Sequence, residues 1–126
     1  MDTQLSGKTV LVTGATRGIG FAIAKRFLND GANVIGTGTS PSGKVPDGCQ
    51  FYTTDFNDSD AIKKFSKEVA GMEIDVLVNS AGINKIGPFA EIDLADFEQI
   101  QQVNVTAPFL LCRAVLNHMK EKRWGR

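Results

Sequence analysis

The sequence predicts an α/β protein with a doubly wound parallel sheet, and two observations support this fold class. Short apolar runs alternate along the chain with stretches whose apolar residues recur at helical spacing. The run DVLVN at 75–79 has little polar alternation, which indicates a strand buried on both faces. Strands that alternate with helices form a parallel sheet covered by helices on both sides. We therefore expect a single domain, residues 1–126.

The first strand, residues 9–13, ends at Gly14 and leads through a glycine-rich turn into a helix that stops at Gly31. The apolar face expected for this helix consists of Ile19, Ala22, Ile23 and Phe27. A second strand begins at 34–35, and the stretch SPSGKVPDG at 40–48 is expected to be a loop without a helix.

The third strand is predicted at 50–54, and the helix after it can be capped by Asp58 and ends at Gly71. The core face of that helix consists of Ile62, Phe65 and Val69. The buried strand at 75–79 then leads into a loop at 82–92.

The last and longest helix is predicted from a cap at Asp93 to about residue 121. Its expected inner stripe consists of Phe97, Ile100, Asn104, Ala107, Leu111 and Ala114. Its other apolar residues, which either pack on the chain's own sheet or meet a second copy, are Leu110, Val115 and Met119. The chain stops where this architecture is due another strand. We therefore expect a bare apolar edge at 75–79 and an N-terminal part of a longer protein.

Composition excludes several classes of function. The chain is 42% hydrophobic and 22% charged, and 14 basic residues balance 14 acidic ones, so no net charge attracts nucleic acid or an anionic membrane. The polar residues 1–8 lack the core of a signal peptide, and no run approaches the ~20 apolar residues of a membrane span. Cys49 and Cys112 are far apart and His118 is the single histidine, so we expect reduced, partly buried thiols, no metal and a cytoplasmic protein.

The stretch TGATRGIG, residues 13–20, places three glycines between a strand and a helix. A helix N-terminus offers free N–H groups and a partial positive charge to an anion. Glycines at this turn allow positive φ and remove the Cβ atoms that would hold a diphosphate away. The pattern indicates a dinucleotide site; the alternative is a tight turn whose glycines only allow close packing.

Arg17 and the end of the second strand predict which cofactor is preferred. An acidic residue about 20 positions after the first glycine commonly binds the ribose 2′-OH of the adenosine. The region GTGTS at 36–40 has no acid, so nothing there repels a 2′-phosphate. Arg17 can pair with that phosphate, and Thr39 and Ser40 can donate hydroxyl hydrogens. We predict NADPH over NADH; the alternative is that Arg17 is a solvated surface charge.

Four segments, in order along the chain, resemble the short-chain dehydrogenase/reductase family in its single-domain oxidoreductase branch: TGATRGIG at 13–20, TDF at 54–56, NSAG at 79–82 and VNV at 103–105. The start of the chain looks most like the 3-oxoacyl-acyl-carrier-protein reductases of that family. The resemblance implies a Rossmann fold of strand order 3-2-1-4 with later strands missing. It also implies NADPH-dependent reduction of a ketone or 3-oxoacyl group, a small-molecule or acyl-carrier-linked substrate, and a homodimer or homotetramer that pairs through the last helix.

The resemblance also implies a role for each matching residue. The implied cofactor-binding residues are Gly14, Thr16, Gly18, Ile19 and Gly20 at the diphosphate turn, Arg17 and Thr39 at the 2′-phosphate, Asp55 and Phe56 at the adenine, and Asn79, Ala81 and Gly82 beside the ribose. The implied catalytic residue is Asn104, the asparagine of a proton relay.

The sequence departs from the family's pattern in three places. Ser80 stands where the family has a second asparagine, and the link between the second and third strands is short. The family's chemistry also needs a serine, and a tyrosine four residues before a lysine, all after the last helix. Tyr52 is the single tyrosine and Phe56 follows it by four positions, so this stretch lacks the general acid, which we expect beyond Arg126.

Pro108 stands four residues after Asn104. Because proline has no N–H, a continuous helix leaves the Asn104 carbonyl without its usual donor. In the family this carbonyl is thought to hold a water in line with the catalytic lysine. We hypothesise that the helix leaves this acceptor open; the alternative is a kink without function.

Two other functions fit parts of the sequence. A nucleotide-binding regulator or redox sensor without turnover would use the same fold, and a Tyr-x3-Lys downstream would argue against it. A sugar-nucleotide epimerase or dehydratase favours Gly-x2-Gly-x2-Gly, a spacing that residues 14–20 do not have.

Overall fold

Four parallel strands form one sheet in the order β3-β2-β1-β4, which confirms the predicted fold class. The computed structural model describes residues 4–126; residues 1–3 of the predicted polar N-terminus lie outside it. The strands are β1 (Thr9–Val12), β2 (Asn33–Gly38), β3 (Gln50–Thr53) and β4 (Val76–Val78). In register, Val10 of β1 lies between Val34 of β2 and Val76 of β4.

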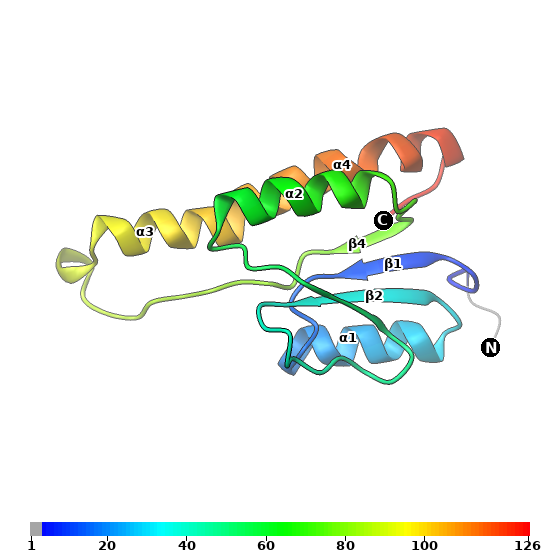
Figure 1. The fold of residues 1–126 in the computed structure, drawn as a ribbon, viewed down its shortest axis with the longest axis horizontal. Coiled ribbons are helices and arrows are strands. Elements are labelled where there is room, and N and C mark those ends of the chain that lie inside the picture. Colours follow the sequence, from blue (N-terminus) through cyan, green and yellow to red (C-terminus); the bar gives the residue numbers. More distant parts are fainter. Residues whose placement is uncertain (1–3) are drawn as a thin grey trace.

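Helices cover both faces of the sheet (Figure 1). Helix α1 (Gly18–Asn29) lies on one face, and α2 (Ser59–Ala70) and α4 (Ala107–Lys122) lie on the other. Helix α3 (Leu94–Gln101) projects past the end of the sheet, and a π-helical turn (Gln102–Thr106) joins it to α4. The loop predicted at 82–92 contains a single 3₁₀ turn, Phe89–Glu91.

Side chains alternate between two cores along each strand, as the period of two in a β-strand requires. Leu11 and Ile35 pack with α2 and α4, while Val10, Val12 and Val34 pack on the α1 side. The chain thus buries a separate apolar layer on each face, and both layers hold the carboxyl ends of the strands in place.

The predicted face of α1 is only partly correct. Gly20 and Ala24 are buried, whereas Ile19 is 76% exposed and Ala22 is also exposed. Gly20 and Ala24 let the two backbones approach closely, the predicted Ile23 and Phe27 pack on the core beside them, and Ile19 lines a cleft instead.

The prediction for α2 is confirmed. The Asp58 carboxylate accepts hydrogen bonds from the N–H groups of Asp60 and Ala61, at 2.9 and 3.3 Å. The three predicted core residues are all buried: Ile62, Phe65 and Val69. This cap and apolar face are local features, which is why the sequence predicts them correctly.

The prediction for the last helix needs correction. Asp93 occupies the cap position, but its side chain makes no capping hydrogen bond. The buried stripe consists of Val103, Ala107, Leu111 and Val115, while Phe97 is 52% exposed and Asn104 is exposed. The predicted stripe therefore holds in α4, where Ala107 and Leu111 are buried and Ala114 packs on the same core, and fails at Phe97 and Asn104 because the π turn changes the helical phase between α3 and α4.

The apolar residues of α4 that could have met a second copy instead pack inside. Val115 is buried, and Leu110 and Met119 pack against the same core. Of the two alternatives left open by the sequence, packing on the chain's own sheet is therefore correct for these residues.

The edge of β4 is not fully bare. The Leu77 N–H donates to the carbonyl of Arg126 at 2.9 Å, and the Arg126 N–H donates to the carbonyl of Asp75 at 3.1 Å. Leu77 and Val78 are half-buried, so burial of this strand on both faces is incomplete in the described residues.

Candidate functional site

The carboxyl ends of all four strands open into one cleft of about 800 Å³. Ligands of open α/β sheets bind at this edge. The structure brings eleven of the predicted cofactor residues to its lining: Gly14, Thr16, Arg17, Gly18, Ile19, Gly20, Thr39, Asp55, Phe56, Ala81 and Gly82.

The three glycines of the turn meet three different requirements. A Cβ on Gly20 would lie 2.0 Å from the carbonyl oxygen of Gly14, so this position must be bare for the helix to begin here. Gly14 has φ +64°, and a Cβ there would lie 2.9 Å from the Cα of Ala81. Gly18 has φ +56° and faces open space. The close-packing alternative therefore explains Gly14 and Gly20, while Gly18 shapes a turn beside empty volume.

The N-terminus of α1 lacks a cap from its own sequence. Arg17 holds the cap position, offers no acceptor, and the first turn contains no acidic residue. The earlier amides of the turn are used internally, since Gly14 N–H donates to Thr37 Oγ1 at 3.2 Å and Ala15 N–H to the Thr37 carbonyl at 2.8 Å. The positive end of the α1 dipole thus faces the cleft without an internal anion.

Thr13 holds the opposite wall. Its Oγ1 accepts hydrogen bonds from the N–H groups of Ser80 and Ala81, at 3.1 and 3.0 Å. Asn79 does not line the cleft; its side-chain amide donates to Cys112 Sγ at 3.6 Å. Asn79 thus lies outside the cleft lining, whereas Ser80 is part of it. From the sequence alone, Ser80 counts only as a difference from the family's motif.

The third wall follows β3. Phe56 is buried, and Asp55 Oδ1 accepts from the Asn57 N–H at 3.0 Å, which leaves the second carboxylate oxygen unbonded within residues 4–126. Thr54 is 8% exposed, and its hydroxyl has no hydrogen-bond partner among those residues. A buried hydroxyl without a partner costs free energy, so Thr54 is an unsatisfied polar group in this wall.

Asn104 does not line the cleft but holds one of its borders. Its side-chain amide donates to the Ile83 carbonyl at 2.8 Å, and its Oδ1 accepts from the Ile83 N–H at 2.9 Å. The side chain therefore fixes the backbone just after the NSAG segment.

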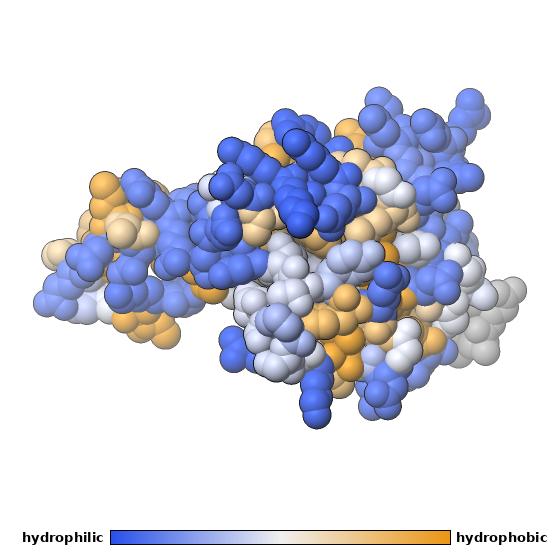
Figure 2. Space-filling model, in the orientation of Figure 1, coloured by the Kyte–Doolittle hydropathy of each residue, from blue (hydrophilic) through white to orange (hydrophobic). Residues whose placement is uncertain are grey.

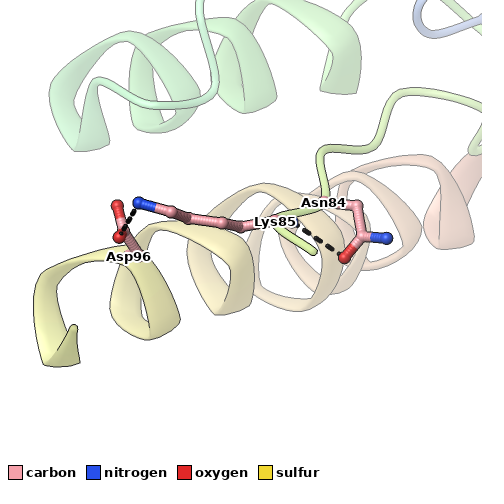
Figure 3. A network of polar contacts seen from close by, with 3 residues as sticks. All are labelled: Asn84, Lys85 and Asp96. Carbon is pink, nitrogen blue, oxygen red and sulfur yellow. Dashed lines mark hydrogen bonds and ion pairs between the residues drawn. The ribbon is translucent and has the colours of Figure 1, made fainter. Parts of the chain in front are cut away.

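The loop after this border is tied to α3 by a surface ion pair. Lys85 Nζ lies 2.5 Å from Asp96 Oδ2, and the Lys85 N–H donates to Asn84 Oδ1 at 2.8 Å (Figure 3). The hydrogen bond to Asp96 and its charge raise the pKa of Lys85 above its ordinary value. Because the pair is exposed, it orients the loop more than it stabilises the fold.

The tyrosine and the two cysteines, whose side chains could in principle take part in chemistry, lie outside the cleft. Tyr52 Oη accepts from Gln50 Nε2 at 3.3 Å, and its ring packs on Phe65 in the core. Cys49 and Cys112 are free thiols, and burial raises the pKa of Cys49; Cys112 is exposed, contrary to prediction. Within residues 4–126 no cluster of three or more His, Cys, Asp or Glu side chains is arranged to hold a metal, and no helix has the length and apolarity to cross a membrane.

Sequence reasoning missed part of the lining: Thr37, Gly38, Thr54, Asn57, Ser80, Ile83 and Val103. Thr37 and Thr54 stand at or just after the carboxyl ends of β2 and β3, so a strand-end signal could have found them. Val103 comes from the π turn and had no local signal.

Comparisons with known proteins agree with this geometry. The profile of the short chain dehydrogenase family matches residues 8–126. The chain is 37% identical to a 3-oxoacyl-acyl-carrier-protein reductase of Aquifex aeolicus, over 100% of this chain and 56% of the relative. It is 32% identical to a 2-dehydro-3-deoxy-D-gluconate 5-dehydrogenase of Formosa agariphila, over 98% of this chain and 51% of that relative.

A solved metagenomic short-chain oxidoreductase in complex with NADP superposes with a TM-score of 0.83 at 34% identity, covering 98% of this chain and 60% of that one. The chain thus spans about half the length of the curated relatives it matches. The profile match, the strand order and the glycine turn agree, and the chain belongs to the short-chain dehydrogenase family.

Proposed function

We propose that this chain forms the NADP(H)-binding part of a reductase that acts on a ketone or 3-oxoacyl group. The observation that carries the proposal is the uncapped N-terminus of α1, which opens beside Gly18 into a cleft at the carboxyl edge of the sheet. Bare amides and a helix dipole at this point suit a diphosphate. The bound nicotinamide would supply the hydride, and this chain's residues would bind and orient the cofactor.

Arg17 and Thr39 support the choice of NADPH. Both line the cleft, Arg17 makes no ion pair within residues 4–126, and no acid stands at 36–40. Ser40, the third predicted phosphate ligand, is exposed and bonds to Ser42 instead. A guanidinium and one hydroxyl remain to bind the 2′-phosphate.

The test is titration of the full chain with NADPH and NADH, with Arg17→Ala beside the wild type. Loss of a charge-assisted hydrogen bond should weaken NADPH binding by about tenfold or more and leave NADH binding unchanged. The matched control is Lys25→Ala, an exposed cation on the same helix. Equal affinity of the wild type for both cofactors would refute the role of Arg17.

We further propose that the substrate is an acyl-carrier-linked or small-molecule carbonyl compound and that the Asn104 carbonyl holds a water. We also propose that a second copy of the chain packs on α3 and α4. The relatives include a 3-oxoacyl-acyl-carrier-protein reductase, which supports the substrate class. Exposed apolar side chains gather on the projecting end of the molecule (Figure 2) and continue along α4 with Phe109 and Leu116, 58% and 51% exposed. Phe109→Glu should shift the sedimentation of any oligomer toward the monomer, and an unchanged oligomer would reject this surface.

A further inference from the structure

The wall of the cleft at 55–58 is tied to a distant helix by Gln102. The Gln102 Nε2–H donates to the carbonyl of Phe56 at 2.8 Å, across 46 positions of sequence. The other hydrogen bonds of this turn are local: Asp55 accepts from Asn57 N–H through its side chain and from Asp58 N–H through its carbonyl, each at 3.0 Å. Gln102 therefore adds a polar tie from a distant segment to a turn that is also anchored by the packing of the Phe56 ring on Phe65.

Gln102 belongs to the π turn that also carries Asn104. From this one turn, Gln102 reaches the wall at Phe56 and Asn104 reaches the border at Ile83. Val103, between them, is 4% exposed and lines the cleft itself. Such insertions into α-helices are frequent at functional sites, and here the turn braces two sides of one cleft.

We propose that Gln102 is a positioning residue for the adenine end of the cofactor. By holding the Phe56 carbonyl, it fixes the neighbouring Asp55 so that the unbonded carboxylate oxygen is ready to accept from an exocyclic amine. An acceptor that is already fixed loses little conformational entropy when the ligand binds, whereas a mobile turn would have to become ordered at that step. This inference rests on the proposed function, since it assumes that a dinucleotide occupies the cleft.

The test compares NADPH with nicotinamide hypoxanthine dinucleotide phosphate, in which a carbonyl replaces the exocyclic amine. In the full chain, Gln102→Met keeps the length of the side chain and removes the donor. We expect NADPH affinity to fall about fivefold to tenfold, while affinity for the hypoxanthine analogue changes much less, so the preference for adenine shrinks. Gln101→Met, on an exposed neighbour, is the matched control and should leave both affinities unchanged.

A second variant guards against a purely structural effect. In Gln102→Glu the ionised carboxylate faces the Phe56 carbonyl, and since both groups are acceptors no hydrogen bond forms. Protonation of the carboxylate at lower pH restores a donor. The NADP⁺ affinity of this variant should rise as pH falls, with no such rise in the wild type. Equal loss of both cofactors in Gln102→Met, or a flat pH profile in Gln102→Glu, would overturn the positioning role. A wild type that binds neither dinucleotide would instead overturn the proposed function.

Discussion

The two ends of the sheet use the same kinds of polar groups in opposite ways. At the carboxyl end, the α1 N-terminus, the Thr54 hydroxyl and one Asp55 oxygen have no partners within residues 4–126. At the amino end, Asp75 accepts from Thr9 N–H at 2.9 Å and lies 2.8 Å from His118 Nε2. The carboxyl end thus leaves hydrogen-bonding groups without internal partners, whereas the polar groups of Asp75, Thr9 and His118 at the amino end bond to one another.

The amino end is closed by a compact cluster. The Lys8 ammonium lies 4.4 Å from the centre of the Trp124 ring, and the Arg126 guanidinium lies 5.2 Å from it. A smaller cleft of about 410 Å³ remains there, and half of its lining consists of these mutually bonded residues. The two clefts therefore differ in their polar groups: the Asp75 cluster at the amino end is internally bonded, whereas the N-terminus of α1 at the carboxyl end has no internal cap among the described residues.

The largest expected effect is at the glycine turn of the carboxyl end, where one glycine is required by packing and another faces the open cleft. Gly20→Ala should lower the free energy of unfolding by about 3 kcal/mol, because the new Cβ collides with the Gly14 carbonyl and backbone must move. Gly18→Ala meets no atom and should cost about 1 kcal/mol for its left-handed φ. Urea unfolding measures both, and similar losses in the two variants would contradict the distinct roles assigned to these glycines.

At the amino end, Asp75→Ala should cost about 2 kcal/mol, since it leaves the Thr9 N–H and the His118 ring without their acceptor. NADPH affinity should not change, because the cluster lies at the opposite end of the sheet. The same urea assay applies, with the exposed Asp47→Ala as control. A stable Asp75→Ala protein would mean that the cluster contributes little to folding.

Acid should lower the free energy of unfolding through the Asp75 carboxylate at the amino end of the sheet. Burial raises the pKa of Asp75, but the Thr9 N–H, His118 and Lys8 outweigh it and hold this pKa below its ordinary value. Its stabilisation is therefore complete above about pH 4 and is lost as pH falls through the lowered pKa. Unfolding free energies measured between pH 5 and 2 should fall less steeply in Asp75→Asn, and parallel curves would rule out this source.

The smallest expected effect concerns the loop that follows NSAG. Lys85→Met removes the ion pair with Asp96 (Figure 3), and because the pair is exposed we expect no measurable change in the unfolding midpoint. Amide exchange at 84–88 should become faster, since the loop loses its tether. Unchanged exchange in this segment would show that the loop is held by other contacts.

Local signals in the amino-acid sequence were sufficient to predict several parts of this protein. The alternation of strands and helices, the Asp58 cap and the core face of α2 follow from apolar periodicity and turn chemistry within short stretches. The strand order was implied by the family resemblance. The glycine turn and the absence of an acid at 36–40 were equally visible, because both depend on residue type at fixed spacing.

The orientation of Phe97 and Asn104 in the long helix, and the contacts of Asn104 and Gln102, depend on how distant segments pack. The predicted stripe holds at Ala107 and Leu111 but fails at Phe97 and Asn104, because the π turn changes the helical phase between α3 and α4. Gln102 to Phe56 and Asn104 to Ile83 are bonds across 46 and 21 positions. Such contacts form only when the sheet has brought distant segments together, and no local pattern encodes them.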